Sequence, residues 1–434
     1  MLRKFTLFIF CNLAIVSMVA GQKPVDKYSS TIAESWYELQ LQMIPKTAGY
    51  APPVVARALG YTGLTLYQAL QPGMNAYNSL EGSLQDLKNV PIPKDNDLLF
   101  WPAVANAAMM NIHMKFYGQD NKDNKLAIEQ LFVENENTFT RKTDPGTLKK
   151  SNAFGIAVAE HIYKYSKTDG GHQAEKNLFP KEYKAPPKSC AWIGVGDQKA
   201  LLPFWGNNRT FLPEIANHTL PEPPKCDIGN SSILYVQALE VYSIGKNLSD
   251  EQKAIADFWA DDAGKTFTPP GHGAAIALQL IRNEDLSLDK AAELLCRIGI
   301  ASNDAFVSCW KCKYQYFLMR PTSFIHSAID DKWKSYLGNP PFPEYTSGHG
   351  TVSGAVAAVL SDMFGYNYAF TDHSHTARGL APRSFDSFQD FAREAALSRL
   401  YGGIHYRMSN EEGLKNGIRI GKKACELKFK MKEG

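Results

Sequence analysis

The 434-residue sequence lacks an excess of charge of either sign. Its 47 lysines and arginines nearly balance 44 aspartates and glutamates, which gives a formal net charge of +3. A protein that binds nucleic acid through its overall field carries a much stronger positive balance. The composition therefore excludes a general nucleic-acid binder and predicts that any functional cations are gathered locally.

Long apolar runs are also missing after the N-terminal segment. No later stretch of the chain reaches 18 uninterrupted apolar residues. A membrane-spanning helix needs about 20 of them. Residues 1–21 carry Arg3 and Lys4, an apolar run from Phe5 to Ala20 and a small-residue exit, a pattern typical of a secretory signal peptide. A membrane anchor is the weaker interpretation because the run is short and interrupted. We expect an exported protein, periplasmic or secreted, whose mature chain has no membrane span.

Alternating strand patterns, internal repeats and low-complexity tracts are scarce. Apolar residues instead recur at helical spacing through most of the chain. The clearest helical segments are residues 54–69, 101–117, 124–141, 151–165, 274–281, 287–296, 303–318 and 352–364. The sequence predicts an all-α fold, a large helical bundle with long irregular loops.

The stretch from about 168 to 232 departs from this pattern because it contains eight prolines. We expect an ordered but irregular excursion there, with helices resuming at Ser232. Taken together, the sequence predicts a single helical domain over 22–434, with an N-terminal half of about 22–232 and a C-terminal half of about 233–434.

Cysteine is sparse: six remain after the leader, namely Cys190, Cys226, Cys296, Cys309, Cys312 and Cys425. An even number in an exported protein permits disulfides, and six cysteines allow 15 pairings. The two that flank the proline-rich loop, Cys190 and Cys226, are the favoured pair. Cys309-Trp-Lys-Cys312 has the spacing of a zinc or redox motif, but no two further zinc ligands follow closely. We therefore expect Cys309 and Cys312 to be small core residues.

What the sequence does contain is three blocks of basic, hydroxyl and imidazole side chains in its C-terminal half. They are Lys313-(six residues)-Arg320-Pro321, then Thr346-Ser347-Gly348-His349, then Ser398-Arg399-(five residues)-His405. A point charge, two planar guanidinium forks and hydrogen-bond donors suit a tetrahedral oxyanion. Each block alone has a plainer interpretation, so the prediction depends on their combination.

In the first block, Lys313 and Arg320 are seven residues apart, close to two helical turns. We expect one helix to present both to the same side and Pro321 to end it. The alternative for such a pair is a solvated helix face.

In the second block, Ser347, Gly348 and His349 precede the apolar segment Val352–Phe364. We expect them at a helix N-terminus, where free amides and the helix dipole attract anions. The plainer alternative is that Ser347 is only the helix N-cap.

In the third block, Arg399 should lie on a helix from about Ser387 through Leu400. Gly402-Gly403 should break that helix and turn His405 back toward Arg399.

Jointly the blocks resemble the signature of the type 2 phosphatidic acid phosphatase and vanadium-dependent haloperoxidase superfamily, with Thr346 in place of a proline. Trp310 and Phe342 stand where haloperoxidases keep aromatic residues beside the halide site. The chain most resembles the soluble exported bacterial members of the haloperoxidase branch. The resemblance implies their helical-bundle fold.

The resemblance also implies a vanadate cofactor, with phosphate as an isosteric occupant, and hydrogen peroxide and a halide as substrates. Iodide or bromide is favoured, and the product would be hypohalous acid. The implied vanadium ligand is His405, and the implied acid–base group is His349. Lys313 would polarise the bound peroxide, and Trp310 and Phe342 would form the halide niche. The implied oxyanion-binding residues are Lys313, Arg320, Ser347, Gly348 and Arg399.

Two alternatives remain open. On the same residues an exported acid phosphatase would cleave phosphomonoesters through a phosphohistidine at His405, with His349 protonating the leaving group. An exported phosphate-binding module would use the cations but neither histidine. The family often places an aspartate four residues after the last histidine, where this chain has Ser409, and we expect the serine to accept the imidazole hydrogen bond without supplying charge.

The remaining histidines and acids receive plainer interpretations. His373 and His375 are expected in a polar loop. Structural roles are expected for three histidines in helical segments, His113, His161 and His326. The acids considered as orienting groups for the site cations are Asp261, Asp262 and Asp304.

Overall fold

The computed structural model describes residues 22–94 and 97–431, so the predicted signal segment, 1–21, lies outside the described residues. The expected all-α fold is confirmed, since α-helices make up nearly all of the regular structure. They are α1 Thr31–Met43, α2 Pro52–Leu70, α3 Trp101–His113, α4 Lys122–Phe139, α5 Pro145–Ser166, α6 Pro213–Ala216, α7 Ile233–Lys246, α8 Asp250–Phe258, α9 Thr268–Asn283, α10 Leu288–Tyr316, α11 Pro321–Ala328, α12 Gly348–Phe364, α13 Phe388–Tyr401 and α14 Arg407–Cys425. Among the described residues, no helix is both long and apolar enough to cross a bilayer.

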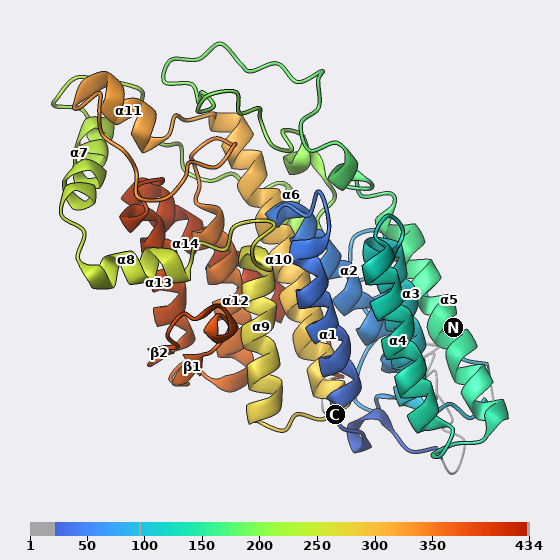
Figure 1. Ribbon diagram of the computed structural model, residues 1–434. Coiled ribbons are helices and arrows are strands. Elements are labelled where there is room, and N and C mark those ends of the chain that lie inside the picture. The colour runs from blue at the N-terminus through green and yellow to red at the C-terminus, as the bar shows by residue number, and fades with distance from the viewer. Residues whose placement is uncertain (1–21, 95–96, 432–434) are drawn as a thin grey trace, which may run out of the picture.

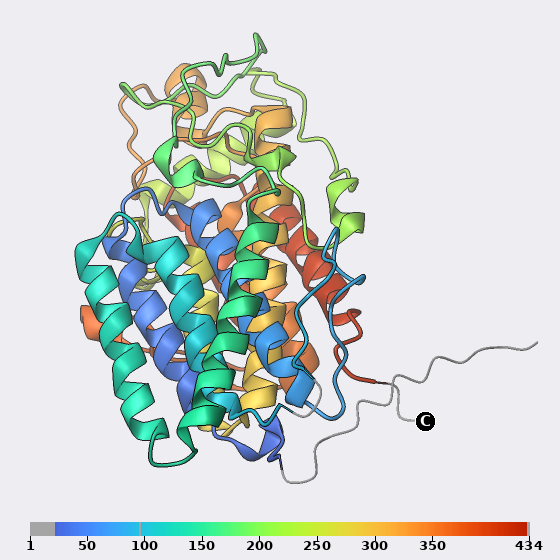
Figure 2. The same ribbon diagram turned by 90° about the vertical axis from the view of Figure 1, so that its right-hand side faces the viewer.

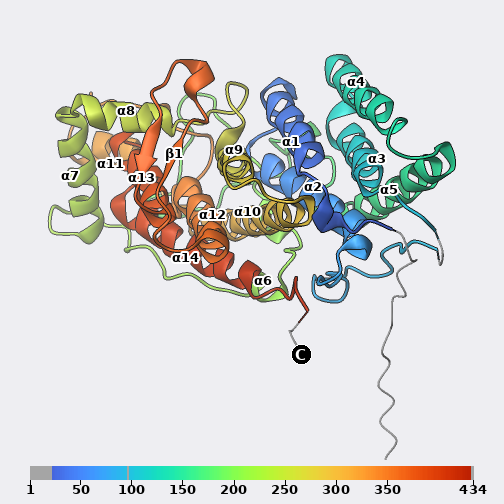
Figure 3. The ribbon, with the colours of Figure 1, turned by 90° about the horizontal axis from the view of Figure 1, so that it is seen from below.

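The helices form two groups on either side of α9 and α10 (Figures 1 and 3). Helices α1 to α5 lie on one side, and α7, α8 and α11 to α14 lie on the other. Helix α10 packs against both α2 and α12, and α12 also packs against α13 and α14. One buried apolar cluster reaches from Val25 to Phe429 and includes side chains from both groups. The central pair therefore belongs to a continuous core.

Helix α10 corrects one expectation, because the segments 287–296 and 303–318 form a single helix rather than two. Gly299, which lies between them, does not end the helix. A Cβ atom there would stand 2.5 Å from the carbonyl oxygen of Leu59 on α2. A glycine inside a helix costs about 1 kcal/mol of helix propensity, and here it allows α2 and α10 to approach closely.

The end of α10 corrects a second expectation: Lys313 and Arg320 do not share a helix. Phe317 adopts a left-handed conformation with φ of 55°, which ends α10 after Tyr316. Arg320 is the N-cap of α11, and Pro321 occupies its first turn. Proline is well suited to that position because its missing N–H needs no partner there and its φ is already helical.

The irregular excursion over 168–232 is confirmed, and α6 is its one α-helix among the described residues. Figure 2 shows its loops over one end of the bundle. A disulfide joins Cys190 to Cys226, as predicted, with 5.7 Å between their Cα atoms. Cys309 and Cys312 are buried with free thiols, which agrees with their expected place in the core.

A small antiparallel ribbon follows α12. Its strands are β1 Phe370–Asp372 and β2 Arg383–Phe385, and Asp372 lies opposite Arg383 in the register. The Asp372 side chain points inward and is fully buried. The ribbon therefore places a carboxylate in the interior near the C-terminal helices.

Candidate active site

The three sequence blocks meet at a cavity of about 780 Å³. Its lining includes Gly348 and His349 from α12, Arg399 from α13 and His405 from the turn that follows α13. Trp310 of α10 and Phe342 also line it. Lys313 and Arg320 lie behind this wall, since each has its cationic group 5.0 Å from the centre of the Phe342 ring.

Lys313 is completely buried and grips the second block through its main chain. Its Nζ donates to the carbonyl oxygens of Pro343, Glu344 and Thr346 at 3.1, 3.0 and 2.5 Å. Burial lowers the pKa of Lys313 to about 8. Because its three N–H donors all have acceptors, Lys313 has no hydrogen bond left to offer a ligand. Its contribution to the cavity is its positive charge.

Arg320 joins the second block to the third. Its Nε and Nη2 donate to the Phe342 carbonyl at 3.1 and 3.0 Å, and its Nη1 donates to the Ile404 carbonyl at 2.8 Å. The same Nη1 lies 3.1 Å from Nε2 of His405. Burial lowers the pKa of Arg320 to about 10. Arg320 reaches the site because the start of α11 faces it, which the sequence spacing did not predict.

Arg399 is the third buried cation. Its Nε donates to the Ser398 hydroxyl at 3.0 Å and its Nη2 to the Ala256 carbonyl at 3.2 Å. Burial lowers the pKa of Arg399 to about 10. In the described part of the chain no carboxylate forms an ion pair with Lys313, Arg320 or Arg399. Because an unpaired buried charge costs several kcal/mol, this arrangement favours an anion in the cavity.

The start of α12 adds hydrogen-bond donors to these charges. The Ser347 hydroxyl caps the helix by accepting from the Gly350 amide at 3.2 Å, so the plainer expectation for this serine is met. Over residues 22–94 and 97–431, the amides of Gly348 and His349 have no acceptor. Free amides at a helix N-terminus suit an anion. The predicted position of this block is confirmed.

His405 is oriented by a carboxylate that the sequence did not reveal. Its Nδ1 lies 2.7 Å from Oε1 of Glu344, whose Oε1 also accepts from the Tyr406 amide at 3.0 Å. Ser409, which the sequence offers as a possible acceptor for the imidazole, does not fill that role. The Ser409 hydroxyl instead donates to the main-chain carbonyl of Glu344 at 3.5 Å.

The turn at Gly402-Gly403 explains this geometry. Gly403 has φ of 74°, and the His405 amide donates back to the Arg399 carbonyl at 3.3 Å. The predicted break and return of the chain are confirmed. They aim the imidazole at the segment before α12, so its carboxylate comes from Glu344 and not from the following turn. No periodic signal in the sequence marks Glu344.

The hydrogen bonds around His405 also fix its tautomer. Arginine can only donate, so Nη1 of Arg320 requires a lone pair on Nε2 of His405. The ring proton therefore resides on Nδ1 and points to Glu344. Burial lowers the pKa of His405 well below its ordinary value, and the charges of Arg320 and Lys313 add to that effect. His405 is a neutral imidazole whose Nε2 lone pair accepts a hydrogen bond from Arg320.

His349 lines the cavity with its ring nitrogen Nε2 buried and without a partner among the described residues. Burial lowers the pKa of His349 well below its ordinary value, and Arg399 contributes further. A neutral imidazole of this kind can accept a proton from a bound molecule. The acid–base role that the resemblance implies for His349 stays a prediction.

The predicted aromatic pair lies together beside the cations. The rings of Trp310 and Phe342 have centroids 4.9 Å apart and an interplanar angle of 49°. Phe306 adds a third ring, with its centroid 5.4 Å from that of Trp310. Aromatic faces next to cations give attractive contacts and exclude water. This wall of the cavity is therefore apolar and positively charged at once.

Among the described residues, the acids considered as partners of the cations form no ion pair with them, although Asp261 and Asp262 line the same cavity. Asp304 accepts from the amides of Phe211 and Leu212 at 2.8 and 2.9 Å, so it fixes the irregular excursion. Asp262 pairs with the exposed Lys265. Asp261 forms hydrogen bonds with His272 and His375.

His375 lies in the loop after β1, as expected, but its side chain is fully buried rather than exposed. His113, His161 and His326 lie on α3, α5 and α11, as expected.

Comparisons with known proteins agree with this geometry. Residues 293–434 match a family model described as "VCPO second helical-bundle domain", and this range contains all three blocks. A vanadium chloroperoxidase of Curvularia inaequalis is 24% identical over 88% of this chain and 79% of its own length. The structure of a bacterial vanadium-dependent iodoperoxidase superposes with a TM-score of 0.84 and 29% identity, covering 95% of this chain and 99% of that one.

The family match, the curated relative and the solved structures support the vanadium haloperoxidase branch for this chain. The resemblance to this branch that the sequence predicts is thereby confirmed. A bacterial vanadium-dependent chloroperoxidase has the same fold, with a TM-score of 0.71 at 16% identity over 93% of this chain and 98% of that one. The vanadium haloperoxidase fold thus covers nearly the whole described chain.

Proposed function

We propose that this protein binds vanadate and uses hydrogen peroxide to oxidise a halide to hypohalous acid. The observation that carries the proposal is the set of three buried cations without carboxylate partners beside a neutral imidazole lone pair. Lys313, Arg320 and Arg399 fit a tetrahedral oxyanion, and Nε2 of His405 fits a metal centre within it. The named activities of the relatives support the same assignment.

The proposed roles follow from each side chain's contacts. His405 would hold vanadium through Nε2, which would give up its hydrogen bond from Arg320, while Glu344 fixes its ring and keeps the proton on Nδ1. The three cations would neutralise the oxygens, and Ser347 and the Gly348 amide would add hydrogen bonds. Bound vanadate supplies a Lewis acid that activates hydrogen peroxide toward halide.

His349 and Lys313 are the remaining catalytic assignments. Nε2 of His349 would take the proton that hydrogen peroxide releases on binding, since it is buried, neutral and without a partner among the described residues. Lys313 would hold positive charge next to the reacting oxygens at a distance set by three main-chain carbonyls.

The aromatic wall supports the halide preference. Trp310 and Phe342 would form a poorly hydrated niche in which a large, weakly hydrated anion loses little solvation. Iodide and bromide meet that condition better than chloride. The adjacent Lys313 and Arg320 charges would attract the anion.

A paired activity assay on one chelator-treated preparation tests this function. Half receives vanadate and half receives phosphate, and each is assayed with peroxide plus iodide, bromide or chloride and with a chromogenic phosphomonoester. We expect halide oxidation only with vanadate and its suppression by added phosphate. Phosphoester cleavage without halide turnover would replace the proposal by its alternative.

One observation favours that alternative, an acid phosphatase. Glu344 supplies the carboxylate beside His405 that the Ser409 position lacks. Nε2 of His405 would form a bond to phosphorus while the ester P–O bond breaks. His349 would pass to the leaving alkoxide a proton that it takes up together with the bound phosphate ester. Water would then hydrolyse the phosphohistidine to return His405 and phosphate. The aromatic niche has no role in this chemistry, so the haloperoxidase remains our proposal.

A further inference from the structure

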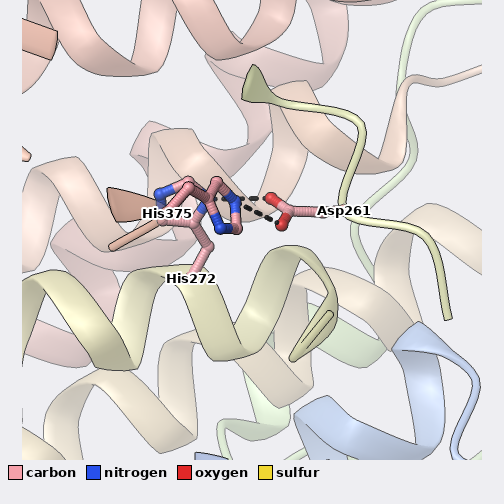
Figure 4. A group of neighbouring side chains, drawn as sticks. All are labelled: Asp261, His272 and His375. Atoms are coloured by element: carbon pink, nitrogen blue, oxygen red, sulfur yellow. Dashed lines mark hydrogen bonds and ion pairs between the residues drawn. The ribbon is translucent and has the colours of Figure 1, made fainter. Parts of the chain in front are cut away.

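Four buried ionisable side chains form a second polar cluster next to the cavity, three of which are drawn in Figure 4. Asp261 comes from the α8–α9 connection, His272 from α9, Asp372 from the end of β1 and His375 from the loop after β1. None of the four is more than 2% exposed. The proposed function gives them no task.

His272 is hydrogen-bonded to a carboxylate through both ring nitrogens. Its Nδ1 lies 2.7 Å from Oδ2 of Asp261, and its Nε2 lies 2.7 Å from Oδ2 of Asp372. An ionised carboxylate can only accept, so each nitrogen must carry a hydrogen. An imidazole with two N–H groups is an imidazolium.

His375 completes the cluster through a hydrogen bond to Asp261. Nη1 of Arg378 lies 3.4 Å from its Nδ1 and can only donate, so Nδ1 accepts. Its Nε2 then carries the proton and donates to Oδ1 of Asp261 at 3.0 Å. Both oxygens of Asp261 are therefore occupied, one by each histidine.

The same residues also resemble a metal-binding group, because ligand atoms of Asp261, His272 and His375 lie within 4.8 Å of one another. Hydrogen bonds already satisfy each of those atoms, at separations of 2.7 and 3.0 Å. Asp372 is satisfied as well, since its Oδ1 accepts from the Ser374 amide at 2.8 Å. The cluster thus needs no ion to be complete.

The cluster adjoins the candidate active site. Asp261 and its neighbours through Lys265 line the large cavity. A small space of about 10 Å³ separates Asp261 and His272 from His349. The Trp259 ring stacks on His272, with centroids 4.5 Å apart and an interplanar angle of 25°. The segment 259–265 is therefore held from behind by His272 and faces the cavity in front.

We propose that His272 is a resident imidazolium clamped between Asp261 and Asp372, and that it is a positioning residue for the cavity wall formed by 259–265. The clamp keeps Asp261 ionised beside the candidate site and fixes the wall that faces His349. Breaking it would leave a buried charge uncompensated and free that wall to move.

The balance of charges supports the clamp. Burial lowers the pKa of His272, but the charges and hydrogen bonds of Asp261 and Asp372 outweigh burial and raise the pKa to about 10. The ionisable groups that face it are those two carboxylates, His375 and, across the small space, His349. The two carboxylates act directly on its ring nitrogens, whereas neither of the two histidines forms a hydrogen bond with it.

Nuclear magnetic resonance of the full chain with ¹⁵N-labelled histidine measures the charge directly. We expect one of the 10 histidines to keep two protonated ring nitrogens from pH 6 to pH 9. This signal should vanish in His272→Gln and persist in His326→Gln, whose ring bonds the Trp333 carbonyl on a distant surface loop. A His272 ring with one proton at pH 7 overturns the proposal, whatever the activity.

The variant Asp372→Asn tests the positioning role, and this kinetic readout alone rests on the proposed function. Its amide oxygen still accepts from Nε2, but the loss of an adjacent charge should lower the pKa of His272 by about 1–3 pH units. Above the lowered pKa the turnover number should fall roughly tenfold relative to wild type, because small misplacements of catalytic groups are costly. KM and vanadate affinity should stay within about threefold of wild type.

Three other results would each decide between these proposals and their alternatives. A turnover profile with unchanged pH dependence in Asp372→Asn, despite a lowered His272 pKa, overturns the positioning role. Stoichiometric divalent metal in the purified protein, with His272 signals that change on chelation, replaces the clamp by a metal site. Absence of halide oxidation in wild type rejects the proposed function but leaves the protonation result valid.

Discussion

Oε1 of Glu344 lies 2.7 Å from Nδ1 of His405, and the two residues are 61 positions apart in sequence. This contact fixes the imidazole so that its other nitrogen faces the cations and the cavity. A carboxylate behind a metal-binding histidine sets its tautomer and raises its basicity. Glu344 therefore supplies the carboxylate that Ser409 cannot provide.

Glu344→Gln should weaken vanadate binding about 10- to 100-fold, the usual cost of losing such a supporting partner. The amide keeps an acceptor for Nδ1–H but lacks the charge that Glu344 carries above its pKa, which burial raises to about 7. Ser409→Ala is the matched control, because its hydroxyl makes one long hydrogen bond of 3.5 Å to a main-chain carbonyl. Vanadate titration of both variants measures this, and a larger loss in Ser409→Ala would contradict the assignment.

Vanadate and phosphate should each raise the thermal stability of the protein, because an anion relieves the repulsion among three buried cations. At a concentration 100 times Kd, a bound ligand adds about 2.7 kcal/mol to the free energy of unfolding. Arg399→Met should lose most of this gain. Arg393→Met on the same helix, where the side chain is 65% exposed, should keep it. Equal gains in both variants would place the anion elsewhere.

Phe342→Leu should reduce the preference for iodide over chloride, measured as the ratio of their kcat/KM values, by about 3- to 10-fold. The change removes the ring that lies 5.0 Å from Lys313 and Arg320, and such contacts contribute about 0.5–2 kcal/mol. Phe179→Leu, on the outer and more exposed wall of the cavity, is the control. An unchanged ratio in Phe342→Leu would rule out the proposed niche.

Folding stability should also depend on pH through His272. Its folded pKa of about 10 exceeds the ordinary value of 6.5. Its contribution is therefore complete below about pH 6.5 and is lost as the pH rises through 10, by up to about 1.4 kcal/mol per pH unit. Lys313 acts oppositely, since its lowered pKa of about 8 makes folding more favourable between pH 8 and 10.5.

The difference between wild type and His272→Gln isolates the histidine, because Lys313 titrates in both. Denaturant unfolding at pH 6, 7, 8 and 9 should show this difference shrinking as the pH rises. A difference that stays constant across this range would mean that His272 is not charged in the folded protein.

Local patterns predicted much of the fold and part of the site. The cap at Ser347, the helix that follows it and the break at Gly402-Gly403 depend on neighbouring residues, and all three expectations are confirmed. The clustering of the blocks follows from a family signature. Such features are visible in sequence because their physical causes lie within a few residues.

The errors arose where distant packing decides the outcome. Gly299 looks like an interruption, yet it permits close contact between α2 and α10. Pro321 was expected to end a helix but begins one, because proline suits both positions equally well. The partners of His405 and His375, Glu344 and Asp261, come from other parts of the chain, so no local spacing could reveal them.

The central claim is that His405 and the three buried cations form one vanadate site. The most direct test is to measure bound vanadium in wild type and in His405→Ala after equilibrium dialysis, with circular dichroism as the check on the fold. We predict one vanadium per wild-type chain and none in the variant, with equal helical content. Stoichiometric vanadium retained by folded His405→Ala would contradict the account.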